Sequence, residues 1–239
     1  MERITVCIVH YNTPKLTAAA IRSLVKHTPR EQELEIIVFD NSDKRPFVVP
    51  DGFPVAVEVI DNTHGQLIDF DRWLATFPDK EPSPGNNYGS AKHCYTVQWL
   101  IDHRKRPFIL MDSDVLIRQD ISVFWNRDYV WTGEVGENVR RRFGYQFKKL
   151  QPFLCFINVK MIRAYGIAYF NPDYMWNLTT RQPNHRYDTG AWFLHETNRL
   201  GLPTQEVKLK DYILHLGHGS WRDKEPMKWL NENKELWEE

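Results

Sequence analysis

The chain has 239 residues, and its 31 Lys and Arg residues are balanced by 31 Asp and Glu residues. This balance argues against a general nucleic-acid-binding surface, and a hydrophobic content of 42% fits a folded protein of one large or two small α/β domains. Apolar runs stay well short of the roughly 18 residues that a membrane span needs, and the sequence does not start with a charged-then-apolar leader. The three cysteines are widely spaced, which favours reduced thiols in a cytosolic protein over a disulfide framework or a zinc site.

The start of the chain predicts a strand, a helix and a second strand. The strands are expected at Ile4–Val9 and Leu34–Phe39, with the helix at Leu16–His27. A βαβ unit makes the two strands parallel, so their carboxyl ends share the edge of the sheet where open α/β sheets bind ligands. Tyr11 and Asp40 follow these strands and are candidate binding residues. The alternatives are a half-buried turn aromatic for Tyr11 and a turn or cap residue for Asp40.

The next predicted elements are a strand at Val55–Ile60 and a short helix at Phe70–Phe77. A longer helix begins at the segment Asn87-Tyr88-Gly89-Ser90-Ala91-Lys92-His93 and runs to Asp102. Small residues at a helix start let a ligand phosphate approach the backbone, and a helix N-terminus favours anions. Lys92 adds positive charge there. The segment is a candidate phosphate-binding site, although such a motif alone is not specific.

An apolar run from Phe108 to Ile117 is interrupted by two carboxylates, Asp112 and Asp114. We interpret the run as a buried strand that ends at the aspartates. Two residues at i and i+2 on an extended segment point to the same face, and two like charges there repel unless a cation lies between them. Hard divalent cations bind carboxylate oxygens and keep positions open for phosphate, so the pair suits a metal-bound diphosphate. The alternative is a pair of solvated loop aspartates.

The second half of the chain predicts shorter elements. Residues 134–151 are rich in Gly, Arg and Lys, which favours a solvated mobile loop slightly over a lid that meets phosphate charge when a donor binds. The other predicted elements are strands at 130–133 and 207–216, helices at 160–165 and 191–200, and a peripheral helix in the charged tail 224–239, while residues 153–159 form an apolar run.

Four motifs stand in order in the first half: Val-His-Tyr-Asn (9–12), Asp-Asn-Ser (40–42), an Asn-X-Gly-Ser-Ala helix start (87–91) and Met-Asp-Ser-Asp (111–114). With residues 166–171, 187–201 and 215–220, this order resembles the family-2 glycosyltransferases of GT-A fold over about residues 3–221. The resemblance implies an α/β, Rossmann-like fold with a mostly parallel central sheet flanked by helices. It also implies one domain at 1–221, with a nucleotide-binding half at 1–117, an acceptor-binding half at 118–221 and a peripheral helix at 222–239.

The resemblance further implies roles for single residues. Tyr11 lies against the nucleotide base and Asp40 hydrogen-bonds to it. Asp112 and Asp114 hold the diphosphate with Mn²⁺ or Mg²⁺, Asp188 deprotonates the acceptor hydroxyl, and a histidine completes the metal shell. Both His215 and His218 have a claim to that position, with His218 slightly favoured. The remaining expected donor-binding residues are His10, Asn87, Gly89, Lys92 and Ser113. Three positions depart from the family pattern: Asn171, Tyr187 and His218.

These inferences predict a metal-dependent, inverting glycosyltransferase of polysaccharide or glycoconjugate synthesis. The expected donor is a UDP-sugar, with dTDP- and GDP-sugars as alternatives, and the acceptor is a glycan, a lipid-linked molecule or a protein. We expect a cytoplasmic protein, with contact to the inner face of the membrane left open. A sugar-nucleotide nucleotidyltransferase is a second hypothesis, but residues 10–15 lack the Gly-rich, basic loop it would need. A third is a non-catalytic sugar-nucleotide or glycan-binding module, which would lack the metal carboxylates or the base.

Overall fold

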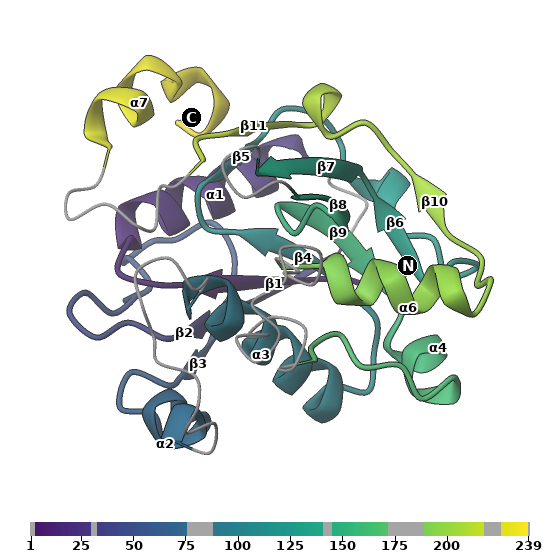
Figure 1. The fold of residues 1–239 in the computed structure, drawn as a ribbon. Helices are drawn as coiled ribbons and strands as arrows, with labels where there is room; N and C mark the ends of the chain where they lie inside the picture. Colours follow the sequence, from purple (N-terminus) through teal and green to yellow (C-terminus); the bar gives the residue numbers. More distant parts are fainter. Residues whose placement is uncertain are drawn as a thin grey trace.

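The computed structural model describes residues 3–29, 33–75, 88–140, 145–171, 189–217 and 226–238. Within them, a seven-stranded sheet has the order β10-β6-β9-β4-β1-β2-β3 (Figure 1). Its strands are β1 (Arg3–His10), β2 (Glu33–Asp40), β3 (Val57–Asp61), β4 (Phe108–Asp112), β6 (Trp131–Gly133), β9 (Leu154–Ile157) and β10 (Gln205–Glu206). The helices are α1 (Pro14–His27), α2 (Phe70–Ala75), α3 (Tyr88–His103), α4 (Val159–Ala164), α6 (Ala191–Arg199) and α7 (Met227–Glu232), with short 3₁₀ turns at Ser122–Phe124, Leu209–Asp211 and Lys234–Leu236.

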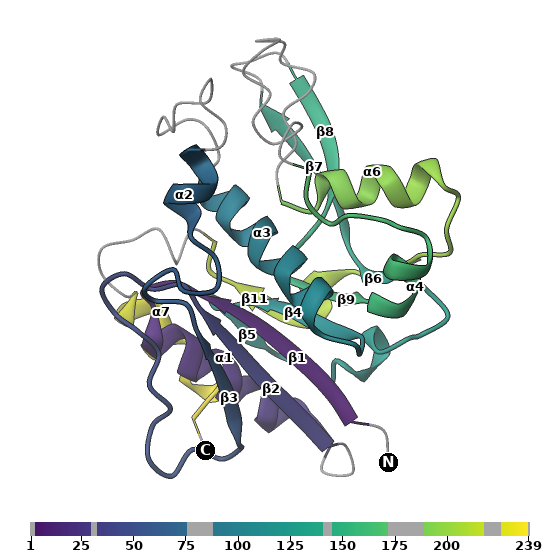
Figure 2. The same ribbon diagram turned by 90° about the horizontal axis from the view of Figure 1, so that it is seen from below.

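Strand β1 lies in the middle of the parallel part of the sheet. It pairs in parallel with both β2 and β4, which confirms the predicted βαβ unit (Figure 2). The register places His10 beside Asp40 and Val9 beside Asp112, so the carboxyl ends of three strands meet at one edge. Strand β9 is antiparallel to both β4 and β6. The sheet is therefore mixed but mostly parallel, as expected.

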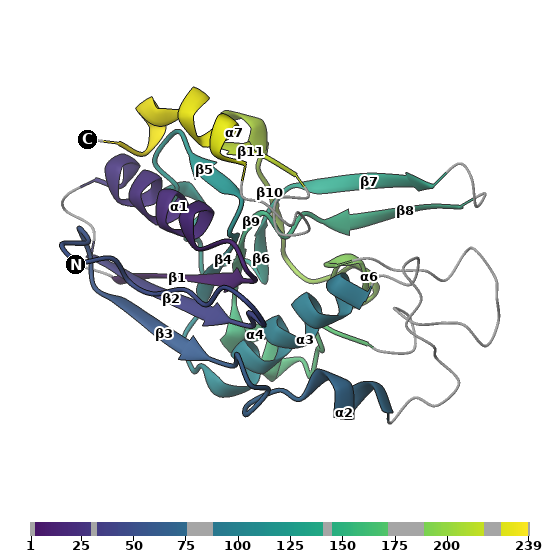
Figure 3. The ribbon, with the colours of Figure 1, turned by 90° about the vertical axis from the view of Figure 1, so that its left-hand side faces the viewer.

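Helices cover both faces of this sheet (Figure 3). On β1, Val6 and Ile8 point to the face covered by α1, whereas Cys7 points to the face covered by α3, α4 and α6. This alternation follows from the two-residue period of a strand. All three side chains are fully buried, which fits the continuous apolar sequence of a strand covered on both sides.

The C-terminal segment packs on α1 and on strand β5 (Val115–Ile117). Leu230 of α7 is 1% exposed and joins Leu16, Ala19 and Leu116 in a small separate cluster. Nζ of Lys26, in the last turn of α1, donates a hydrogen bond to the carbonyl of Glu235 at 2.8 Å. The predicted tail helix is thus one wall of the cluster that lies behind β5.

The structure corrects the prediction of a loop at residues 134–151. Strands β7 (Val135–Arg140) and β8 (Tyr145–Leu150) form an antiparallel hairpin that extends beyond the main sheet (Figure 3). The base of the hairpin packs on the core, since Leu150 is fully buried and Val135 lies against the same cluster, but the many charged residues of the segment concealed its strands. The strand predicted at 207–216 is also wrong in extent, because a 3₁₀ turn at Leu209–Asp211 separates β10 from β11 (Ile213–His215).

Among the described residues, none of the helices has both the length and the apolar sequence that crossing a bilayer would take.

Candidate active site

Two aspartates and a histidine meet at the carboxyl edge of the sheet. Asp112 is the last residue of β4, Asp114 lies in the turn before β5, and His215 is the last residue of β11. One side-chain oxygen or nitrogen atom of each lies within 4.8 Å of the other two. Nε2 of His215 is 3.3 Å from Oδ1 of Asp114. The structure therefore brings together three of the predicted metal ligands, although Ser113 and Asp114 form a turn rather than the extended segment we expected.

Strand pairing holds this cluster in place. β11 runs antiparallel to β5 with His215 opposite Val115, and the amide of Leu216 donates a hydrogen bond to the carbonyl of Asp114 at 3.1 Å. The His215 ring also packs on Phe153, with 3.8 Å between ring centroids. These contacts fix the imidazole beside the carboxylates.

The electrostatic setting keeps Asp112 charged. Burial is the largest single influence and would raise the pKa of its carboxyl, but the charge and hydrogen bond of His93 and the other nearby cationic groups together outweigh it, so the pKa falls below its usual value. His215 and Lys149 act in the same direction. Two carboxylates and one imidazole fit a hard divalent cation such as Mn²⁺ or Mg²⁺, which would retain open coordination positions for phosphate oxygens.

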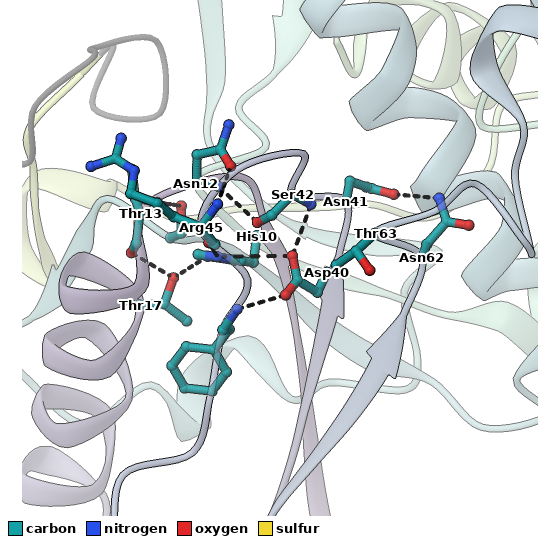
Figure 4. Close-up of polar contacts among 12 residues, drawn as sticks. His10, Asn12, Thr13, Thr17, Asp40, Asn41, Ser42, Arg45, Asn62 and Thr63 are labelled. Carbon is teal, nitrogen blue, oxygen red and sulfur yellow. Dashed lines mark hydrogen bonds and ion pairs between the residues drawn. The ribbon is translucent and has the colours of Figure 1, made fainter.

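The loop after β2 is built around Asp40 and His10 (Figure 4). The Asp40 carboxylate accepts hydrogen bonds from the amides of Ser42 at 2.8 Å and Phe47 at 2.6 Å, and the residue is 1% exposed. His10 is fully buried, and its Nδ1 lies 2.7 Å from Oγ1 of Thr17. The resemblance implied direct donor contacts for both residues, whereas both side chains are buried at the carboxyl edge of the sheet.

Asn12 is a further organising residue of this loop, and the sequence reasoning assigned it no role of its own. Its φ of 56° lies in the left-handed region, which Asn tolerates better than most residues. Its side-chain oxygen accepts hydrogen bonds from the backbone amides of Lys44 and Arg45, each at 3.0 Å. Its own backbone amide donates a hydrogen bond to Oγ of Ser42 at 2.9 Å. An Asn in the turn that follows a strand is the sequence signal that would have found it.

Tyr11 and Lys92 lie next to each other at the same edge of the sheet. Nζ of Lys92 is 6.0 Å from the centroid of the Tyr11 ring and 5.1 Å from that of the Phe70 ring. Burial lowers the pKa of the Lys92 ammonium, while Asp71 and Asp43 oppose the shift. A half-buried cation between two aromatic rings is a setting in which a base and a phosphate can both be bound.

The remaining predicted residues are placed as follows. Gly89 is exposed in the first turn of α3. Ser113 is 3% exposed, and its hydroxyl lies 3.3 Å from that of Thr13. Asn87, Asp188 and His218 lie outside the described residues.

A cavity of about 1100 Å³ lies at the opposite end of the sheet, where the parallel strands begin. Its lining includes Arg3, Lys105, Arg106, Trp125 and Lys160 and none of the predicted site residues. Open α/β sheets bind their ligands at the carboxyl ends of the strands, and the Asp112–Asp114–His215 cluster lies at that edge. We therefore place the candidate active site there.

No protein-family model and no curated protein sequence matches the chain. Solved structures do match it in fold. Mouse xyloside xylosyltransferase 1 in its apo form aligns with a TM-score of 0.56 and 10% identity, over 87% of this chain and 86% of that one. The galactosyltransferase LgtC, in complex with donor and acceptor sugar analogues, aligns with a TM-score of 0.55 and 12% identity, over 87% of this chain and 74% of that one. At these identities the likeness concerns the fold alone, and with the central sheet and its helices it shows that the chain has the GT-A fold of nucleotide-sugar transferases.

Proposed function

We propose that the protein is a metal-dependent glycosyltransferase that moves a sugar from a nucleotide-diphospho-sugar to an acceptor hydroxyl. The observation that carries this proposal is the Asp112–Asp114–His215 cluster at the carboxyl edge of a GT-A sheet. It is supported by the contacts of Lys92 with the rings of Tyr11 and Phe70, which supply aromatic faces and a cation.

The donor would be bound in two parts. Tyr11 would stack against the base, and Lys92, with Gly89 and Asn87 at the helix start, would meet the phosphates. Because Asp40 and His10 are buried, we propose that they support the donor site by fixing the two loops that carry Tyr11 and Ser42. We favour UDP as the nucleotide, as the resemblance implies.

The diphosphate would face the cluster. Asp112, Asp114 and His215, with His218 as the alternative histidine, would hold Mn²⁺ or Mg²⁺, and such a cation neutralises negative charge on a departing diphosphate. Lys149 of β8 is close enough to Asp112 to lower the pKa of that carboxyl, so the base of the hairpin adds positive charge at the same place.

We propose an inverting displacement with Asp188 as general base. The acceptor oxygen forms a bond to the anomeric carbon while the bond from that carbon to the diphosphate oxygen breaks, and the acceptor proton moves to Asp188. In the sequence, Asp188 directly precedes Thr189 and Gly190, where α6 begins. The family resemblance carries this assignment, and we extend it to a cytoplasmic role in polysaccharide or glycoconjugate synthesis.

A thermal-shift screen tests the proposal. UDP, GDP, dTDP and AMP would each be added with Mn²⁺, with Mg²⁺ and with EDTA. Binding to the folded state alone stabilises it by about 2.7 kcal/mol at a ligand concentration of 100 Kd, so UDP with Mn²⁺ is expected to raise the melting temperature. If none of the nucleoside diphosphates shifts melting with either metal, the proposal fails.

Asp188→Asn then tests the base. Asn has nearly the shape of Asp but cannot take up the proton, and the N-cap of α6 is Gly190 rather than residue 188. With a UDP-sugar that the screen supports, we expect normal binding of UDP and Mn²⁺ and a loss of about 10²–10⁴-fold in transfer rate. Near-normal transfer would reject Asp188 and direct the search to Asp173 or Glu196.

A further inference from the structure

His93 contacts the metal cluster from a neighbouring helix, and neither the family resemblance nor the ligand set gives it a role. It lies on α3, directly after Lys92. Its Nε2 is 3.0 Å from Oδ1 of Asp112, and the two side chains are 18% and 19% exposed. The atoms that converge as metal ligands are those of Asp112, Asp114 and His215, without His93. His93 therefore reaches the centre through Asp112.

The other ring nitrogen of His93 has no such partner. Nδ1 is buried and makes no hydrogen bond within the part of the chain that the structure describes. A buried polar atom left without a partner is uncommon and destabilising, so it calls for a reason. With the proton on Nε2, the ring donates one hydrogen bond, to Asp112, and leaves a bare lone pair at Nδ1. The position of the ring therefore gives Asp112 a hydrogen bond but leaves Nδ1 without one.

We propose that His93 is a positioning residue of the metal centre. Its Nε2–H donates to Oδ1 of Asp112, which would leave Oδ2 available for a cation and hold the carboxylate in one orientation. Groups that hydrogen-bond to metal-binding carboxylates orient them in this way, and their loss typically lowers metal affinity about 10- to 100-fold. The inference rests on the proposed function, since it assumes that the cluster binds a divalent cation.

The same helix would then act on both halves of the donor. Lys92 reaches toward Tyr11 and Phe70, while the next residue, His93, holds Asp112. Because adjacent helical residues point in different directions, α3 can contribute to the nucleotide pocket and to the metal centre from one turn.

The test is a titration of the protein with Mn²⁺ alone. Binding is monitored through the electron paramagnetic resonance signal of free Mn²⁺. His93→Ala removes the ring, and His93→Leu removes the donor while it keeps most of the bulk. His93→Gln restores a donor near the place of Nε2, whereas the shorter His93→Asn places its amide near Nδ1. His103→Ala is the matched control, because His103 is on the same helix but bonds to the carbonyl of Trp99. Melting temperatures in EDTA would accompany each titration.

We expect about 10- to 100-fold weaker Mn²⁺ binding in the Ala, Leu and Asn variants, near-normal binding in His93→Gln, and no change in His103→Ala. Wild-type affinity in both His93→Ala and His93→Leu would overturn the proposal and leave the proposed function standing. Weak binding in His93→Ala alone, or a failure of Gln to restore it, would also overturn the proposal, since packing rather than the hydrogen bond would then explain the loss. If the wild-type protein binds no Mn²⁺ and UDP gives no thermal shift, the proposed function itself is rejected, and the role of His93 with it.

Discussion

Nε2 of His215 lies 3.3 Å from Oδ1 of Asp114, although the two residues come from distant parts of the chain. Antiparallel pairing of β5 with β11 produces this contact, because it sets His215 opposite Val115, the residue after Asp114. The histidine that completes the cluster is thus positioned by backbone pairing.

This arrangement predicts the behaviour of Asp114→Asn. The variant is expected to lose the Mn²⁺-dependent stabilisation by UDP while its metal-free form melts at or above the wild-type temperature. The reason is that the substitution removes one of two neighbouring like charges and a metal ligand together. Isothermal calorimetry with Mn²⁺ and UDP measures the loss. Asp128→Asn, at an exposed aspartate, is the control, and wild-type binding in Asp114→Asn would count against the metal centre.

Tyr11 supplies a prediction for the nucleotide pocket. Burial raises the pKa of its hydroxyl, and the nearby Asp43 adds to the shift. Tyr11→Ala should weaken UDP binding by about 1–3 kcal/mol if the base stacks on the ring. Tyr11→Phe keeps the ring and should bind nearly as the wild type does. Calorimetric titration with UDP separates the two, and equal binding by Tyr11→Ala would leave Tyr11 as a turn residue.

Two glycines with positive φ give a matched pair at the ends of α6. Gly190 has φ +78°, and a Cβ there would lie 2.2 Å from the carbonyl oxygen of Leu150. Gly201 has φ +62° and open space around that position. Gly201→Ala should cost about 1–2 kcal/mol, since only left-handed strain is added. Gly190→Ala should cost clearly more, because the end of β8 must also move. Urea denaturation compares them, and equal losses would show that the contact with Leu150 is unimportant.

The C-terminal segment is expected to contribute to stability through one leucine. Leu230→Ala should lower the free energy of unfolding by about 2–5 kcal/mol, because Leu230 is buried against Leu16 and Leu116. Met227→Ala, one turn earlier at a residue that is 40% exposed, should change it by less than about 0.5 kcal/mol. Urea denaturation again provides the measurement. Similar small effects from both variants would mean that α7 is only loosely attached.

Stability should decrease as the pH falls below about 6.5, the ordinary pKa of histidine. Burial lowers the pKa of His10 in the folded state, although Asp40 opposes the shift. The unfolded chain therefore binds the His10 proton first, so this contribution is complete above pH 6.5 and is lost as the pH falls toward the folded-state pKa. Urea denaturation at pH 7.5, 6.5 and 5.5 measures the slope. His10→Gln should flatten it and the exposed-loop control His64→Gln should not; an unchanged slope in His10→Gln would contradict the assignment.

Local patterns predicted the mostly parallel sheet and its first helix. The strands at Ile4–Val9 and Leu34–Phe39 are seen because each is a continuous apolar run, and the helix between them because its apolar residues recur at helical spacing. The hairpin β7–β8 was missed because its many charged residues hide the alternating pattern of its strands. The contact of His93 with Asp112 had no sequence signal, since only the packing of α3 on the sheet brings the two together. Asp40 follows a strand as predicted, but its burial by the amides of the next loop depends on φ of Asn12 and the path of residues 42–47.

The pairing of β5 with β11 also has a consequence for how the protein is made. Asp112 and Asp114 are synthesised long before the segment that carries His215. The nascent chain therefore holds two neighbouring carboxylates before the histidine of the cluster exists. Pairing between segments this far apart in sequence is slow, because a large loop must close first. The metal centre would therefore be among the last parts to form. A cation present during refolding would stabilise molecules in which β11 has already paired with β5. It would therefore raise the yield of native protein more than the rate of early collapse.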